Sequence, residues 1–118
     1  MNYNFIPSMA FAKSAKNLKK KYKSLPDDIE DFKKEFQKNP NIGTDLGDGF
    51  RKIRMEIKSK NKGKRGGARV ITYELCVKLL EDLTDILLVD IYDKSEIESI
   101  PEERMTFIVK SYIDDAIE

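Results

Sequence analysis

The sequence contains no histidine and no tryptophan, and its only cysteine is Cys76. Without histidine, the usual acid–base residue of hydrolases near neutral pH is missing. A single cysteine cannot form an internal disulfide, and one cysteine without histidine argues against a zinc site. No apolar run approaches the roughly 20 residues that span a bilayer. These absences predict a protein of the reducing cytoplasm that has no metal, no cofactor and no membrane segment.

The 118 residues fit one domain, residues 1–118, and a domain of this size buries a core without disulfides. The net charge of +1 hides a strong segregation of charge. Residues 1–25 carry six lysines and no acidic residue, and residues 50–70 carry nine basic residues and one acidic residue, whereas residues 71–118 carry thirteen acidic and four basic residues. We expect a basic side that attracts a polyanion, unless folding interleaves these segments.

The spacing of apolar residues predicts a short strand at 2–6, a helix at 9–24 and a second helix that starts near Pro26. Residues 43–49 read as a loop, after which the apolar period changes to two over residues 50–58. A basic loop at 59–67, strands at 68–77 and 86–92, and a final helix from Pro101 complete the pattern.

This order predicts a compact α/β fold of the α+β kind, in which an N-terminal helical hairpin packs on a twisted, mainly antiparallel sheet and a C-terminal helix follows. One face of the sheet covers the hairpin, and we expect the other face to be free to bind a partner.

Cationic side chains on these strands are the candidates for chemistry. Lys52 and Arg54 share one strand face, Arg69 begins the next strand, and Lys94 follows the last. Cations around a phosphodiester stabilise the charge of its transition state, and a lysine crowded by other cations becomes a better base. The alternative is a basic strand face that only promotes solubility. Four acidic residues form a weaker candidate, for a divalent metal or for ordinary solvated surface: Asp90, Asp93, Glu96 and Glu98.

Three segments in order resemble the RelE toxins and their HigB-like relatives. They are residues 50–54 (FRKIR), residues 66–73 (GGARVITY) and residues 87–96 (LLVDIYDKSE), and the opening KSAKNL at 13–18 before a helical hairpin also fits. The resemblance implies a compact RelE-like fold. It also implies an mRNA interferase: an endoribonuclease of a type II toxin–antitoxin system that cleaves mRNA in the ribosomal A site without a metal, through attack of the 2′-hydroxyl on the adjacent phosphate. A cognate antitoxin then inhibits the toxin.

The resemblance also assigns roles to residues. Lys52 and Arg54 fall on the family's lysine-x-lysine strand, Arg69 on its glycine-x-arginine strand, and Lys94 on the basic position after the last strand. Five cations in and beside the basic loop are expected to bind the ribosome through 16S rRNA: Lys58, Lys60, Lys62, Lys64 and Arg65.

Two positions depart from the family pattern. Arg54 stands where the family has lysine, and arginine is a poor base, so Lys52 is the expected base. The family's tyrosine after the last strand would fall near Ile100, where this sequence has none. Tyr92 could take its place by stacking on a base, or it could be an aromatic residue of the core.

Two other functions stay open: a ParE-like inhibitor of DNA gyrase, and an RNA-binding module on the ribosome without chemistry. For the toxin, we expect an acidic, partly disordered antitoxin that folds on binding, and a C-terminal helix that is mobile or displaced.

Overall fold

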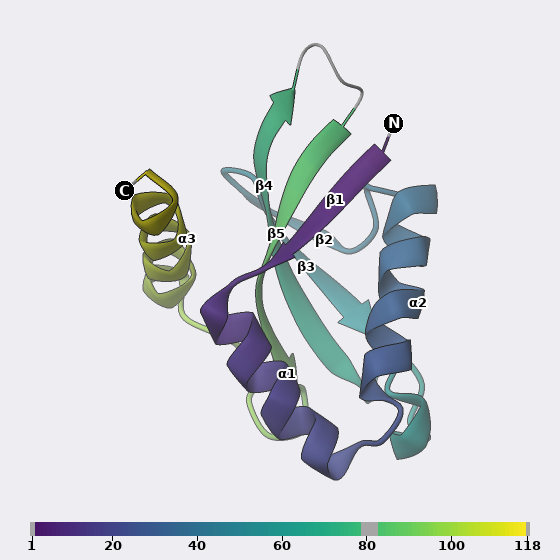
Figure 1. Ribbon diagram of the computed structural model, residues 1–118. Helices are drawn as coiled ribbons and strands as arrows, with labels where there is room; N and C mark the ends of the chain where they lie inside the picture. The colour runs from purple at the N-terminus through teal and green to yellow at the C-terminus, as the bar shows by residue number, and fades with distance from the viewer. Residues whose placement is uncertain (1, 79–82, 118) are drawn as a thin grey trace.

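A computed structural model describes residues 2–78 and 83–117 of the chain, without the side chains of residues 76–78 (Figure 1). The elements in chain order are β1 (Asn2–Pro7), α1 (Met9–Lys21), α2 (Leu25–Lys38), β2 (Thr44–Gly47), β3 (Phe50–Met55), a short 3-10 turn (Lys58–Lys60), β4 (Ala68–Lys78), β5 (Leu83–Asp93) and α3 (Glu102–Ile117). No described helix is both long enough and apolar enough to cross a membrane.

Local sequence signals define the two helices of the hairpin. Ser8 caps α1: its hydroxyl accepts a hydrogen bond from the Phe11 amide at 2.9 Å and donates one to the Val89 carbonyl at 2.7 Å. The same side chain therefore starts α1 and ties it to β5. Pro26 lies in the first turn of α2, where its missing N–H is tolerated, and Asp27 and Asp28 favour that end of the helix dipole.

The strands form one sheet in the order β1-β5-β4-β3-β2. β1 runs parallel to β5, and the other neighbouring strands are antiparallel. The hairpin packs on one face, and the core there is built from apolar side chains of α1, α2 and β3–β5. Among them are Phe11, Leu18, Phe32, Phe36, Ile53, Val70 and Leu88. The predicted mixed α/β fold with a mainly antiparallel sheet is confirmed at this level.

Two expectations about the fold are wrong. The segment expected to be a loop at 43–49 contains β2, a short exposed edge strand paired with β3. The second face of the sheet is also not free, because α3 packs there on the side away from the hairpin (Figure 1). Met105, Ile108 and Val109 of α3 form a second core with apolar side chains of β4 and β5. The apolar stripe of the last helix predicts its burial but not the surface that it covers.

Candidate functional site

Three candidate residues form one row across the sheet. Arg54 of β3 pairs in register with Arg69 of β4, and Arg69 pairs with Tyr92 of β5. Lys52 lies two residues before Arg54, and therefore on the same strand face. Lys94 joins them because its backbone amide donates to the Gly67 carbonyl at 3.2 Å.

Gly67 is the residue that permits this close approach. A Cβ atom at position 67 would clash with the carbonyl oxygen of Met55, the last residue of β3. A side chain there would therefore force β3 and the start of β4 apart. The glycine before the arginine strand thus lets the basic residues of neighbouring segments come together.

All four cationic candidates line one hollow of about 590 Å³, which we call the basic groove. Its lining residues are Ile42, Gly43, Thr44, Leu46, Lys52, Arg54, Lys64, Arg69 and Lys94. No acidic side chain is among these residues. The groove therefore concentrates positive charge at a surface open to a ligand, as an anion site requires.

Arg69 is the buried member of this set, with 5% of its surface exposed. Its guanidinium donates to three backbone carbonyls, those of Lys64 at 3.3 Å, Ala68 at 3.1 Å and Arg65 at 3.1 Å. Burial, and then the charge of Arg54, lowers the pKa of Arg69. Within the described part of the chain no carboxylate pairs with Arg69, so it both holds the basic loop and keeps its charge for the groove.

Tyr92 is buried, and its ring packs in the α3 core beside Met105. This position favours the core-aromatic alternative over stacking on an exposed base. Its hydroxyl is buried and has no hydrogen-bond partner among the described residues. Burial raises the pKa of Tyr92, against the opposing charge of Arg69.

Three of the lysines assigned to RNA binding are paired with carboxylates. Lys58 contacts Asp31 at 2.7 Å, Lys60 contacts Asp93 at 2.6 Å, and Lys64 pairs with Glu35. For Lys62 and Arg65 the described structure gives no such pairing. Folding therefore interleaves part of the charge that the sequence segregates, and it leaves the groove and the loop tip as the less compensated sites.

Three of the four acidic candidates, Asp90, Asp93 and Glu96, each contact partners of their own. Asp93 is fully buried and accepts hydrogen bonds from Lys60, from the Tyr22 hydroxyl at 2.7 Å and from the Ser95 amide at 2.9 Å. Burial alone would raise the pKa of Asp93, but these donors outweigh it and hold the pKa well below its usual range. The hydrogen bond to Asp93, together with burial, raises the pKa of Tyr22 to about 12.

Asp90 accepts from the Ser14 hydroxyl at 2.7 Å, and Glu96 pairs with Lys21 at 2.6 Å. Among the described residues no three histidine, cysteine, aspartate or glutamate side chains gather in a way that would hold a metal ion.

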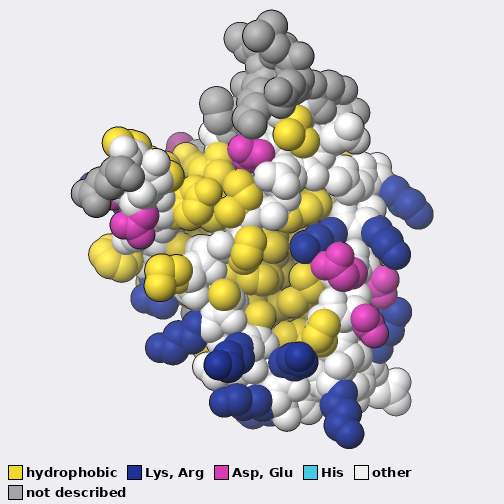
Figure 2. Space-filling model, in the orientation of Figure 1, with side chains coloured by type: hydrophobic (Ala, Val, Ile, Leu, Met, Phe, Trp, Pro, Cys, Tyr) yellow, Lys and Arg dark blue, Asp and Glu magenta, His cyan; other side chains and the backbone are white. Residues whose placement is uncertain are grey.

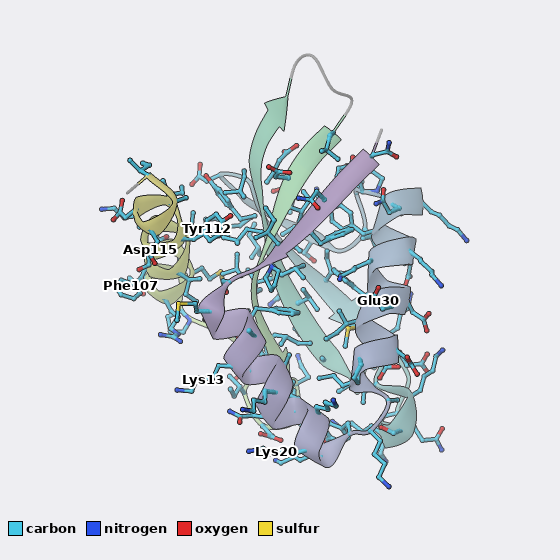
Figure 3. The ribbon with its side chains drawn as sticks, in the orientation of Figure 1. Lys13, Lys20, Glu30, Phe107, Tyr112 and Asp115 are labelled. Atoms are coloured by element: carbon cyan, nitrogen blue, oxygen red, sulfur yellow. The ribbon has the colours of Figure 1, made fainter. Side chains whose placement is uncertain are left out.

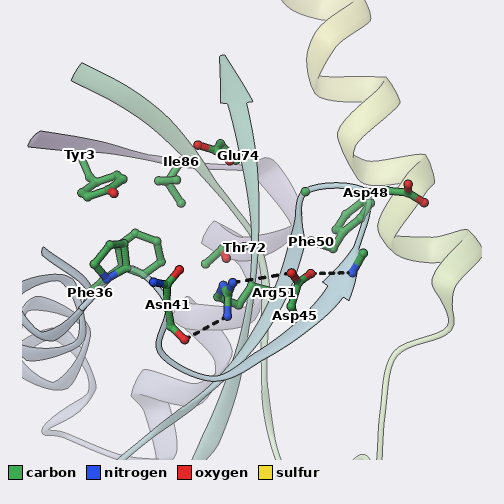
Figure 4. A pocket seen from close by; sticks show the side chains of 13 residues that line it. Tyr3, Phe36, Asn41, Asp45, Asp48, Phe50, Arg51, Thr72, Glu74 and Ile86 are labelled. Atoms are coloured by element: carbon green, nitrogen blue, oxygen red, sulfur yellow. Dashed lines mark hydrogen bonds and ion pairs between the residues drawn. The ribbon is translucent and has the colours of Figure 1, made fainter. Parts of the chain in front are cut away.

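Arg51 belongs to a different surface. It lines a hollow of about 340 Å³ together with residues such as Tyr3 and Phe36 (Figure 4). Its guanidinium donates to the Asn41 carbonyl at 3.1 Å and lies 3.9 Å from Asp45. The charge of Arg51 is therefore used to hold the segment before β2, on the face opposite Lys52 and Arg54.

A further set of lysines covers the exposed side of α1. Figure 2 shows Lys and Arg side chains gathered around the end of the molecule where α1 lies, and Lys13 and Lys20 extend away from the sheet in Figure 3. No lysine of α1 is among the lining residues of the basic groove.

No family model matches this chain.

Proposed function

We propose that this chain is a metal-independent endoribonuclease of the RelE type, a toxin that cleaves mRNA in the ribosomal A site and so stops translation. The observation that carries the proposal is the basic groove, in which Lys52, Arg54, Arg69 and Lys94 line one hollow without an acidic side chain. Such a cluster suits a phosphodiester, whose transition state gains negative charge.

The proposed reaction needs only groups of the RNA and of the groove. The 2′-oxygen of one nucleotide attacks the adjacent phosphorus, and the bond from phosphorus to the 5′-oxygen of the next nucleotide breaks. Lys52 acts as the base and accepts the proton of the 2′-hydroxyl. The ammonium of Lys94 donates a proton to the leaving oxygen, which yields a cyclic phosphate and a 5′-hydroxyl.

Arg69 and Arg54 stabilise the charge on the phosphoryl oxygens in this scheme. Arg69 is preorganised, because three carbonyl contacts fix its guanidinium before RNA arrives. Arg54 is exposed and faces it across the strand pair, so it adds a second charge from the other wall. Lys62 and Arg65 of the loop then add affinity for the ribosomal RNA backbone.

The same charge argues for an acidic inhibitor. A cognate antitoxin with an acidic, partly disordered segment would neutralise the groove in the cytoplasm, where the toxin acts. The second candidate is an RNA-binding module without chemistry. It is favoured by the carbonyl contacts of Arg69, which by themselves explain the burial of that residue as structural.

Inducible expression separates these functions. We expect growth arrest with cleaved transcripts for the wild-type chain and loss of both effects for Lys52→Ala. Arrest with intact transcripts and accumulated DNA breaks would favour gyrase inhibition. Arrest with intact transcripts and intact DNA would favour the binding module, and harmless expression of folded protein would refute a toxin.

A further inference from the structure

A second hollow, of about 250 Å³, adjoins the basic groove on the side of α3. We call it the apolar hollow, and its walls include Leu46, Phe50, Lys52, Tyr92, Ile100 and Met105. Leu46 and Lys52 line both spaces. The apolar hollow is thus a neighbour of the groove with a different chemistry, mostly aromatic and aliphatic instead of cationic.

The hydroxyl of Tyr92 is unexplained by the packing of the fold. Tyr92 is 3% exposed, and its hydroxyl lacks a hydrogen-bond partner among the described residues. A buried hydroxyl without a partner is unfavourable, and phenylalanine would fill the same space beside Met105. Tyr92 is part of the hollow's wall, so a ligand there would contact the residue that carries this hydroxyl.

Phe50 supplies a flat apolar surface at the same place. Its ring lies 4.8 Å from that of Tyr73, which supports it from the neighbouring strand. Ser99 and Glu102 add polar groups to the lining. Flat apolar walls with a few polar groups match a nucleobase, whose faces stack on aromatic rings and whose edges form hydrogen bonds.

We infer that the apolar hollow binds the base of a nucleotide whose phosphate lies in the basic groove. The inference rests on the proposed function only for the phosphate position. One ribose joins base to phosphate, so the two ligand groups belong in adjoining spaces such as those on either side of Lys52. The volume also suits a single base, because it is below the roughly 300–1,000 Å³ of sites for larger ligands.

Methionine methyl groups report on this site directly. Three of the four methionines serve as reporters: Met105 lines the apolar hollow, Met55 lies in the hairpin core, and Met9 is 86% exposed. In the full chain with 13C-labelled methionine methyls, adenosine monophosphate should shift the Met105 signal and leave Met55 and Met9 unmoved. Ribose 5-phosphate, which lacks the base, should shift the amides of Gly43 and Lys94 in the groove without moving the Met105 signal.

The base should also add affinity. We expect adenosine monophosphate to bind roughly tenfold or more tightly than ribose 5-phosphate, the gain typical of stacking a base on aromatic side chains. Leu46→Trp should fill the hollow and bring the affinity for adenosine monophosphate down to the affinity of the same variant for ribose 5-phosphate. Ile97→Trp is the matched control, because Ile97 is similarly exposed and does not line the hollow. Tyr92→Phe should reduce the advantage without loss of thermal stability.

The outcomes separate the base site from the proposed chemistry. Equal affinities for the two ligands, with the Met105 signal unmoved, would overturn the base site even if ribose 5-phosphate binds the groove. Binding of adenosine monophosphate that moves Met105 in both wild-type and Leu46→Trp proteins would overturn it as well. A shift of the Met105 signal with unmoved Gly43 and Lys94 amides would keep the base site and refute the phosphate position. A deoxyhexanucleotide that binds more tightly than the mononucleotide assigns the site to a strand, and equal affinities assign it to a free nucleotide.

Discussion

Arg54 and Arg69 stand directly opposite each other on the antiparallel pair β3–β4. Like charges in opposed positions destabilise a sheet, and here one of the two is also buried. The backbone carbonyls of Lys64, Ala68 and Arg65 offset part of this cost by accepting hydrogen bonds from Arg69. An unfavourable charge pair that lines an open groove is what a preformed anion site requires.

Replacing the exposed member of this pair should therefore stabilise the fold. We expect Arg54→Gln to raise the free energy of unfolding by about 0.5 kcal/mol, because a cross-strand repulsion is removed, and to reduce RNA cleavage. Urea unfolding measures the first effect and a cleavage assay the second. Lys110→Gln on the exposed side of α3 is the control, with neither effect. A destabilised Arg54→Gln protein would contradict the repulsion.

Arg69→Ala should cost both activity and stability. Loss of a preorganised charge contact lowers a rate about 10²- to 10³-fold. The three carbonyl contacts also predict that the free energy of unfolding falls by about 1–3 kcal/mol. Growth arrest and thermal unfolding should be compared with Lys62→Ala, for which we expect a modest loss of binding and unchanged stability. A fully toxic Arg69→Ala protein would exclude Arg69 as the phosphate contact.

The hydroxyls of the partly buried Tyr22 and the buried Tyr92 should respond in opposite ways to removal. The Tyr22 hydroxyl donates to Asp93 at 2.7 Å, whereas that of Tyr92 has no partner among the described residues. Tyr22→Phe should destabilise the protein by about 1–2 kcal/mol, and Tyr92→Phe should leave stability unchanged or raise it. Thermal unfolding of the two variants measures the difference, and equal losses would show that Tyr92 has a partner in solution.

The lowered pKa of Asp93 predicts how the free energy of unfolding depends on pH in acid. Its pKa in the folded protein lies below the unfolded value of about 3.9, so its contribution is complete above that value and is lost as the pH falls toward the folded pKa. Asp93→Asn breaks a buried pair with Lys60 and should cost about 3 kcal/mol at pH 7. Urea unfolding measures the difference in the free energy of unfolding between the wild-type and Asp93→Asn proteins. We expect this difference to be constant from pH 7 to about pH 5 and smaller at pH 3.

The exposed pair of Asp31 and Lys58 offers a matched control for that experiment. Both side chains are about half exposed, so solvent screens their attraction. Asp31→Asn should therefore change stability little at either pH. If the difference in the free energy of unfolding between the wild-type and Asp93→Asn proteins grew in acid, Asp93 would not have a lowered pKa in the folded protein.

Local patterns predict much of this fold, because each depends on residues close in the sequence. The period of two after Phe50 placed Lys52 and Arg54 on one face, and Pro26 marked the second helix. The burial of α3 against the second sheet face was missed, since an apolar stripe does not name its partner. The pairing of Lys60 with Asp93 was also missed, because it depends on how segments 33 residues apart are brought together.

Mapping of RNA 5′ ends in cells that express the chain is the sharpest test of a ribonuclease site in the basic groove. For the wild-type protein we expect new ends that carry a 5′-hydroxyl, within codons of translated messages. The ends should be absent for folded Lys52→Ala protein and present for Lys110→Ala, a cation of α3 outside the basic groove. Equal numbers of such ends with wild-type and Lys52→Ala proteins, or none with folded wild-type protein, would contradict a ribonuclease site in the basic groove.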